Sequence, residues 1–250
     1  MKVILPKDLP NRLDGIELDM QDGSGAKQSI KRKIIKKHLK GKKILDVGCG
    51  EGEVSMGLGD ITGVDVSEPR LEIARKNGLK TIKADVCKIP TDEKFDAAIV
   101  ADLIEHMQRP YDLLMEANRL LKPGGQLFLE TPNALNFMRF LQLLFREKTR
   151  EESPNHLFLF DRISLTEMLS RTDFIIDKIY YYGFTFPGWR FFTAKLGKGK
   201  YSSKTKKYYV KTRNKNLDKL SLMSKLGWVL GRLFKPFAYS LLIVAHKRDE

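Results

Sequence analysis

The chain has 250 residues, 42% of them hydrophobic, which is enough for one large domain, or a domain with an appended segment, built on a buried core. Charged residues make up 30% and aromatic residues 10%, a composition that excludes a wholly disordered chain. The two cysteines exclude a disulfide framework, and we expect a cytoplasmic protein without a signal peptide.

The net charge of +14 is concentrated in two segments. Residues 27–43 carry nine cations and no anion, and residues 185–237 carry 14 cations and the single anion Asp218. Residues 44–184 are mildly acidic, with 17 cations and 23 anions. Such an asymmetry indicates an anionic partner, which can be a membrane surface, a nucleic acid or a phosphorylated substrate.

In chain order, the first predicted element is a helix over 27–40, where Ile30, Ile34 and Leu39 stand near helical spacing on a lysine-rich background. After it, short segments rich in Val, Ile and Leu alternate with helical stretches, which is typical of a parallel sheet covered on both faces. The first five predicted strands are 42–47, 61–66, 79–86, 95–101 and 125–131. The predicted helices among and after them are 70–77, 110–121, 136–145 and 164–170.

A sixth strand over 173–184 and a last strand over 239–247 are separated by a basic insertion, 185–237. The insertion mixes aromatic residues with lysines, and its second half, 217–237, has apolar residues at helical spacing between cations. This pattern suits an amphipathic helix on an anionic membrane, whereas the interruptions at Arg232 and Lys235 disfavour a spanning helix. Two alternatives stay open: contact with RNA phosphates and bases, and a lid whose cations are merely solvated.

A glycine-rich turn follows the first strand. Residues 46–52 read DVGCGEG, and Asp65 ends the second strand. Glycines let the backbone turn tightly and approach a ligand, and a carboxylate at the end of the second strand can accept both hydroxyls of a ribose. The G-x-G-x-G spacing departs from the dinucleotide fingerprint, and the carboxylates of Asp46 and Glu51 would repel a pyrophosphate. The turn therefore favours S-adenosylmethionine, which carries an amino group and a sulfonium, over NAD.

Five runs of residues stand in order along these strands and turns. They are ILDVGCGEG (44–52), GVDVSE (63–68), KADVCKIP (83–90), FDAAIVADLIEHMQRP (95–110) and LLKPGGQLFLETPN (120–133). Together they resemble the signatures of class I S-adenosylmethionine-dependent methyltransferases, and most of all the branch that includes ubiquinone-biosynthesis O-methyltransferases. The resemblance implies an α/β fold: a doubly wound, seven-stranded, mostly parallel sheet with an antiparallel last strand. Only 13 positions separate Gly52 from Asp65, fewer than is usual in that family, so the first helix should be short, over 53–58.

The resemblance also implies the residues that bind the cofactor. On the methionine side they are Asp46, Gly48, Gly50, Ala101 and Leu103. On the adenosine side they are Asp65, Val66, Asp85 and Val86. Of the latter, Asp65 would bind the ribose and Val66 would pack against adenine. The Asp85 side chain and the Val86 backbone N–H would bond the adenine edge.

Two histidines are candidates for the general base that a hydroxyl acceptor needs. His106 follows the fourth strand and His156 follows the fifth, so both belong to the edge of the sheet where ligands bind in such folds. Each can equally be a loop histidine that bonds the backbone. Glu105 would orient His106 or cap the next helix, and Glu130 is a further candidate. No cluster of residues has metal-ligand spacing, so we expect no metal.

These features predict three parts: an N-terminal segment with the basic helix (1–41), a cofactor-binding methyltransferase domain (42–184 and 238–250), and the insertion (185–237). The expected function is O-methylation of a small apolar or lipid-linked acceptor, by a protein peripheral to the inner face of a membrane. Two other functions stay open: an RNA methyltransferase that holds phosphates with the insertion, and a non-catalytic membrane-attached module. The acceptor, the methylated atom and the oligomeric state do not follow from the sequence.

Overall fold

The computed structural model describes residues 23–136, 139, 156–183, 200–202, 207–209 and 238–249. They fall into two compact units. The first contains residues 23–134, 156–181 and 240–249, and the second contains the other described residues. The helix predicted over 136–145 lies largely outside the described residues.

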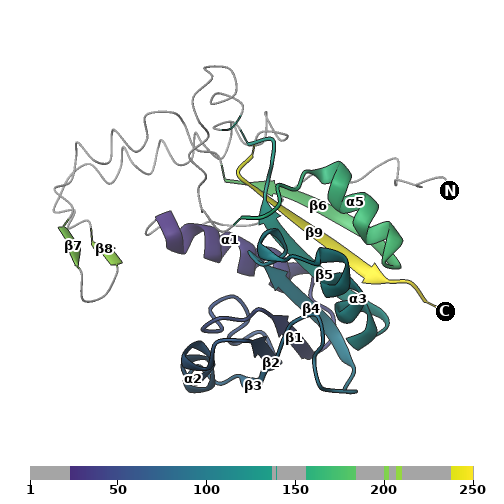
Figure 1. The fold of residues 1–250 in the computed structure, drawn as a ribbon, viewed down its shortest axis with the longest axis horizontal. Coiled ribbons are helices and arrows are strands. Elements are labelled where there is room, and N and C mark those ends of the chain that lie inside the picture. Colours follow the sequence, from purple (N-terminus) through teal and green to yellow (C-terminus); the bar gives the residue numbers. More distant parts are fainter. Residues whose placement is uncertain are drawn as a thin grey trace. The chain divides into compact units, whose positions relative to one another are not determined.

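The first unit is built on a seven-stranded sheet with the strand order β3-β2-β1-β4-β5-β9-β6 (Figure 1). Its strands are β1 (Lys43–Val47), β2 (Asp60–Asp65), β3 (Lys80–Lys83), β4 (Phe95–Ala101), β5 (Leu121–Pro132), β6 (Phe174–Tyr182) and β9 (Ser240–Lys247). The pairs β1–β2, β1–β4, β2–β3 and β4–β5 are parallel, and β9 runs antiparallel to β5. The predicted sheet, mostly parallel with an antiparallel last strand, is confirmed.

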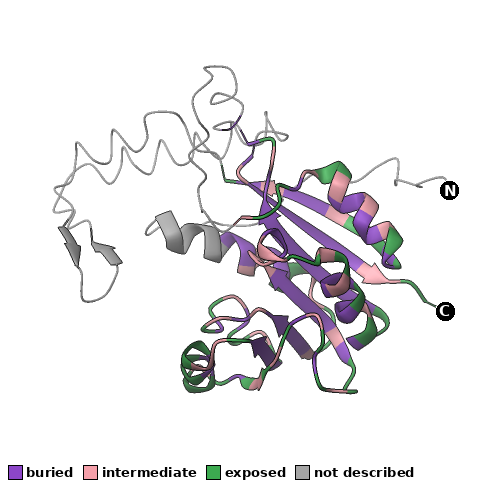
Figure 2. Cartoon of the chain, viewed as in Figure 1, coloured by how far each residue is buried: buried purple, intermediate pink, exposed green. Residues whose placement is uncertain are grey.

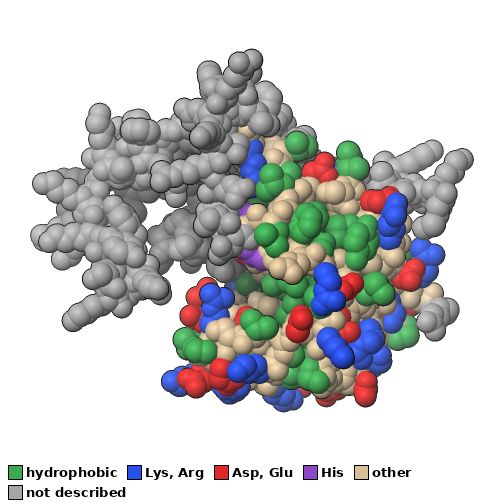
Figure 3. Space-filling model, viewed as in Figure 1, with side chains coloured by type: hydrophobic (Ala, Val, Ile, Leu, Met, Phe, Trp, Pro, Cys, Tyr) green, Lys and Arg blue, Asp and Glu red, His purple; other side chains and the backbone are tan. Residues whose placement is uncertain are grey.

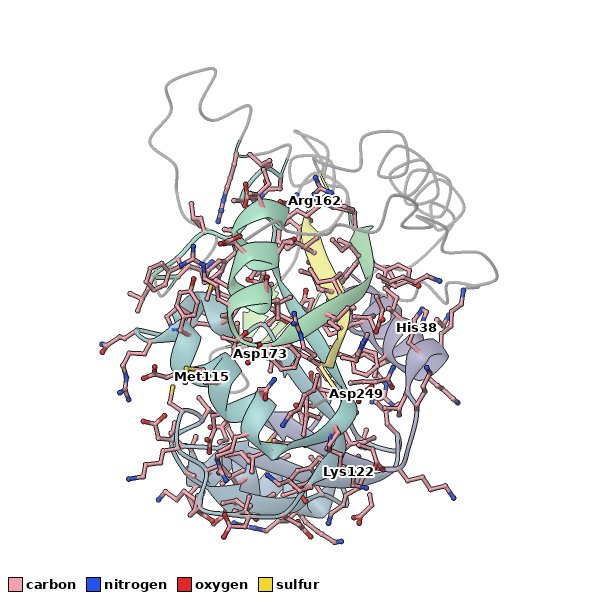
Figure 4. The ribbon with its side chains drawn as sticks, turned by 90° about the vertical axis from the view of Figure 1, so that its right-hand side faces the viewer. His38, Met115, Lys122, Arg162, Asp173 and Asp249 are labelled. Atoms are coloured by element: carbon pink, nitrogen blue, oxygen red, sulfur yellow. The ribbon has the colours of Figure 1, made fainter. Side chains whose placement is uncertain are left out.

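Helices cover both faces of this sheet. They are α1 (Gly23–His38), α2 (Glu68–Lys76), η1 (Ile104–His106, a single 3-10 turn), α3 (Pro110–Leu120) and α5 (Arg162–Arg171). Helices α3 and α5 lie on one face and α1 lies on the opposite face, with His38 at its end (Figures 1 and 4). Local sequence sets where the helices begin. Pro110 stands in the first turn of α3, and the Asp161 carboxylate accepts the Ser164 N–H at 2.8 Å in a capping box that starts α5.

The core lies between the helices and the central strands. Leu45 of β1, Ile99 of β4, Leu127 of β5 and Ile243 of β9 are all completely buried. Figure 2 shows the same pattern, with buried strands inside and exposed residues on the outer faces of the helices. Near-continuous apolar strands are what burial on both faces of a parallel sheet requires.

The prediction of a helix over 53–58 is wrong. Residues 51–59 form consecutive turns, with one helix-like hydrogen bond from Met56 N–H to the Gly52 carbonyl at 2.9 Å. The glycines at 52 and 57 have φ of +81° and +75°, a left-handed backbone that interrupts a right-handed helix. The interval between β1 and β2 therefore stays a loop.

The described part of the insertion is a short antiparallel ribbon in the second unit. It consists of β7 (Lys200–Ser202) and β8 (Lys207–Tyr209), with Lys200 opposite Tyr209. The amphipathic helix predicted over 217–237 lies outside the described residues. Among the residues that are described, no helix combines the length and apolar character that a membrane span needs.

Candidate cofactor and acceptor site

The glycine turn stands at the carboxyl end of β1 and is held against β2. The N–H groups of Gly48 and Cys49 both donate to the Val64 carbonyl, at 2.8 and 3.0 Å. Gly48 has φ of +71°, and a Cβ there would come within 2.8 Å of Leu103, so both the backbone and the neighbouring turn require glycine. At Gly50, where φ is +54°, a Cβ would meet no atom within 4 Å among the described residues. The turn is thus closed at Gly48 and open at Gly50.

Asp65 fixes this turn from the end of β2. Its carboxylate accepts the Gly50 N–H at 3.0 Å and the Ser67 N–H at 2.9 Å, and its side chain is buried. The next residue, Val66, is 65% exposed, which is unusual for a large apolar side chain and leaves an apolar surface beside the turn.

The two predicted residues of the next loop differ in burial. Asp85 is exposed, and its carboxylate accepts the Cys87 N–H at 2.9 Å. Val86 is buried in the core.

Asp46 is the buried carboxylate of the turn. It is 2% exposed and accepts a hydrogen bond from the Ser55 hydroxyl at 2.6 Å. Burial raises the pKa of Asp46 to about 6, while the Ser55 bond and the charge of Lys31 oppose the rise. Burial also raises the pKa of the neighbouring Cys49 to about 12, with the carboxylates of Asp46 and Asp65 adding to it, so this thiol stays protonated and unreactive.

An ion cluster around a buried cation lies at the same edge of the sheet, with the Asp102 side chain 37% exposed. The Lys31 ammonium of α1 lies 2.6 Å from the Asp102 carboxylate, just after β4, and 2.9 Å from the Glu130 carboxylate of β5. Lys31 is completely buried and Glu130 is 1% exposed. The sequence predicted Glu130 as a further candidate for the acceptor chemistry, or else as a strand-edge carboxylate, but did not single out Lys31 or Asp102. Lys31 is one of nine cations in its segment, and no spacing distinguishes the one that is buried.

The two candidate histidines are brought together. The rings of His106, on η1, and His156 meet edge to face with centroids 4.7 Å apart. The chain after His156 is tied to η1, because the N–H groups of Leu157 and Phe158 donate to the Glu105 carbonyl at 2.8 and 3.2 Å. Both residues are partly exposed. Figure 3 shows histidine side chains at the surface of the face that it draws, without distinguishing them by residue.

Glu105 is 2% exposed and accepts a hydrogen bond from the Thr131 hydroxyl at 2.9 Å, and burial raises its pKa. It does not cap α3, because that helix has no side-chain cap. Potential ligand atoms of Glu105, His106 and His156 lie within 4.8 Å of one another, a clustering that residue spacing along the chain could not reveal. The other two histidines lie elsewhere: His38 bonds Tyr180, and His246 bonds Asp177.

Comparison with known proteins identifies the central segment. Residues 45–129 match the family model described as a methyltransferase domain. They form a methyltransferase domain. This domain carries the glycine turn, Asp65, Asp102 and His106, whereas Lys31 and His156 lie outside the match.

Relatives and solved structures agree with this assignment. The ubiquinone biosynthesis O-methyltransferase of Dechloromonas aromatica is 40% identical over 107 residues, which cover 38% of this chain and 46% of that protein. The match thus spans less than half of the relative's length. A methyltransferase of Thermotoga maritima described as dependent on S-adenosylmethionine superposes with a TM-score of 0.57 at 20% identity, covering 89% of each chain. The magnesium protoporphyrin IX methyltransferase of Synechocystis, solved with S-adenosylhomocysteine, gives a TM-score of 0.52 at 14% identity, covering 92% of this chain and 89% of its own. The chain that contains this segment therefore has the fold of S-adenosylmethionine-dependent methyltransferases.

Proposed function

We propose that the chain is an S-adenosylmethionine-dependent methyltransferase. The observation that carries the proposal is the open backbone at Gly50, which lies in the turn beside the carboxylates of Asp46 and Asp65. Those carboxylates suit the ammonium and the ribose hydroxyls of the cofactor, and exposed Val66 offers adenine an apolar surface. When bound, the cofactor supplies the activated methyl group, so the chain has to align the acceptor and exclude water.

The test compares alanine at two glycines that differ in place but not in backbone strain. Gly50 and Gly57 both have positive φ and open space for a Cβ among the described residues, so either substitution should cost about 1 kcal/mol of stability. Gly50→Ala would fill the space beside the turn, and we expect it to weaken S-adenosylmethionine binding in titration calorimetry about tenfold or more. Gly57→Ala should bind like wild type. No heat of binding with the wild-type protein would remove the proposed function, and equal losses at both glycines would remove Gly50 from the site.

On the acceptor side, we place His106 and His156 as candidate bases. The edge-to-face pair lies just beyond β4 and β5, on the side of the sheet where the glycine turn stands. A hydroxyl acceptor must lose its proton as the methyl group arrives, and an imidazole in contact with the hydroxyl can take it. The second ring would then hold the first in place, a role for which the 4.7 Å separation is short enough.

The acceptor that we propose is a small apolar or lipid-linked molecule, methylated on oxygen at a membrane surface. Three observations support this. The similar proteins are named as ubiquinone biosynthesis O-methyltransferases. The run Leu157, Phe158 and Leu159, directly after His156, is 56%, 41% and 54% exposed, although all three side chains are apolar. Finally, the two basic segments of the sequence would meet anionic lipid favourably.

A further inference from the structure

Lys31 is an unusual residue for the core of a protein. Its side chain is completely buried, although it belongs to a helix whose lysines at 33, 36 and 37 are exposed or partly exposed. A buried ammonium is costly to desolvate and persists only where carboxylates pair with it. Asp102, just after β4, and Glu130 of β5 provide that pairing at 2.6 and 2.9 Å.

Asp102 connects this cluster to the glycine turn. It has φ of +50°, a left-handed conformation that is strained for a residue with a side chain, and its N–H donates to the Glu130 carbonyl at 3.1 Å. The next residue, Leu103, packs so closely on the glycine turn that a Cβ at Gly48 would lie 2.8 Å from it. Any movement of Asp102 therefore moves Leu103 against the turn.

The charge around Lys31 is predominantly negative. The acidic groups at this edge come from β1, β2, the exit of β4, η1 and β5, and they are Asp46, Asp65, Asp102, Glu105 and Glu130. The two imidazoles of His106 and His156 lie at the same edge. Lys31 is the buried cation among them, and its charge lowers the pKa of Asp46.

We propose that Lys31 is a positioning residue of the cofactor site, a role that rests on the proposed function. Its ammonium holds Asp102, and with it Leu103, in place against the glycine turn, and keeps the carboxylate of Asp46 charged for the cationic end of the cofactor. Helix α1 thereby completes a site that the methyltransferase domain of residues 45–129 leaves unfinished.

The test measures cofactor affinity against pH by titration calorimetry. In the wild type, affinity should fall as the pH drops through the pKa of Asp46, about 6. This fall is the acidic limb of the curve of affinity against pH. Lys31→Met should weaken binding at neutral pH about tenfold or more and move this acidic limb up by about one pH unit, because the carboxylate loses its cation. Lys36→Met, at an exposed position of the same helix, should change neither value.

Two further variants separate positioning from mere stability. Ile34→Ala removes a completely buried side chain of α1, so it should lower the melting temperature while leaving the acidic limb at its wild-type pH. If Lys31→Met folds poorly, the double variant Lys31→Met/Glu130→Gln balances the buried charge again and should keep the shifted limb. An unmoved limb in the Lys31 variants, or the same shift in Ile34→Ala, would overturn the inference while wild-type binding upholds the proposed function. No binding by the wild type would overturn both.

Discussion

At the scale of single residues, Asp46 shows that a buried, charged carboxylate in the site lowers the stability of the folded chain. A carboxylate that is 2% exposed loses nearly all of its hydration, and the hydrogen bond from Ser55 replaces only part of it. With its pKa raised from 3.8 to about 6, Asp46 binds a proton more tightly in the folded chain than in the unfolded chain. Its contribution to folding is therefore most favourable below pH 4 and is lost as the pH rises through 6.

Asp46→Asn should remove this pH dependence. The rise in the pKa of Asp46 by about two units corresponds to about 3 kcal/mol. As the pH rises from 4 to 7, the free energy of unfolding of the variant should therefore increase by about 2–3 kcal/mol relative to that of the wild type. Urea denaturation of both proteins at each pH measures the difference, in which contributions from other groups cancel. A difference that stays constant with pH would show that Asp46 has an ordinary pKa.

The histidine pair makes a separate prediction about catalysis. His106→Gln and His156→Gln should bind S-adenosylmethionine like wild type, because neither ring belongs to the glycine turn. The variant that lacks the base should form S-adenosylhomocysteine about a hundredfold more slowly with a phenolic probe acceptor. A variant of the second ring should lose less. If both variants keep the wild-type rate, neither imidazole takes the proton.

Sequence reasoning predicted the residues of this site unequally. Gly48 and Asp65 follow from a local pattern, since a glycine turn after one strand and an acid at the end of the next are together typical of a nucleoside-binding sheet. Lys31 and Asp102 could not be predicted, because their roles depend on which face of α1 meets the sheet and on a strained φ after β4. The clustering of Glu105, His106 and His156 is equally invisible in one dimension, because 50 positions separate the two histidines.

At the scale of elements, α1 supports the loop that replaces the predicted helix over 53–58. The Arg32 guanidinium donates to the carbonyls of Glu53, Val54 and Met56 at 2.8, 3.0 and 2.7 Å. These consecutive turns do not form the repeated backbone hydrogen bonds of a helix, so the three carbonyls need an external donor. A planar guanidinium with several N–H groups can serve three carbonyls at once.

Arg32→Ala should therefore loosen this loop. We expect a loss of about 1–2 kcal/mol in free energy of unfolding and faster amide hydrogen exchange over residues 53–58, because water replaces the guanidinium only in part. Arg32→Lys should be intermediate, since an ammonium cannot reach all three carbonyls. Lys36→Ala, at an exposed position of the same helix, is the matched control. Unchanged exchange over 53–58 in Arg32→Ala would mean that the turns hold themselves.

The elements that the sequence predicted well are those with a strong pattern. The strands at 95–101 and 239–247 agree with β4 and β9 almost to the residue, since each apolar run ends at a charged residue, Asp102 after one and Lys247 in the other. The third strand is shorter than predicted: β3 covers only Lys80–Lys83, at the edge of the sheet, where pairing on one side alone limits its length. The helix over 53–58 was expected from the family resemblance and the short interval before Asp65, and it failed because the glycines at 52 and 57 take a positive φ.

At the scale of the whole molecule, charge is segregated along the chain. The sheet and the site are contributed largely by the mildly acidic residues 44–184, and the excess cations belong to 27–43 and 185–237. On α1 and just after it, Lys36 and Lys40 are exposed, while Lys31 is buried in the site. One basic segment thus serves two purposes, an internal counterion and an outward positive surface. Each cation near an anionic membrane contributes about 1 kcal/mol, so several together can recruit a protein.

Flotation with liposomes tests whether this charge serves a membrane. The protein should float with phosphatidylglycerol vesicles but not with phosphatidylcholine vesicles, and about 0.5 M salt should release it because ions screen the attraction. Deleting 185–237 should abolish most of the flotation, whereas Lys36→Glu/Lys40→Glu should weaken it only in proportion to the charge removed. RNA added as a competitor should leave the bound fraction unchanged. Absence of flotation combined with salt-sensitive RNA binding would overturn the membrane proposal, because phosphate contacts would then account for the cations. Retained flotation in the deletion variant would instead assign the membrane contact to α1 and the exposed apolar run at 157–159, and the search for a lipid-linked acceptor would continue from that surface.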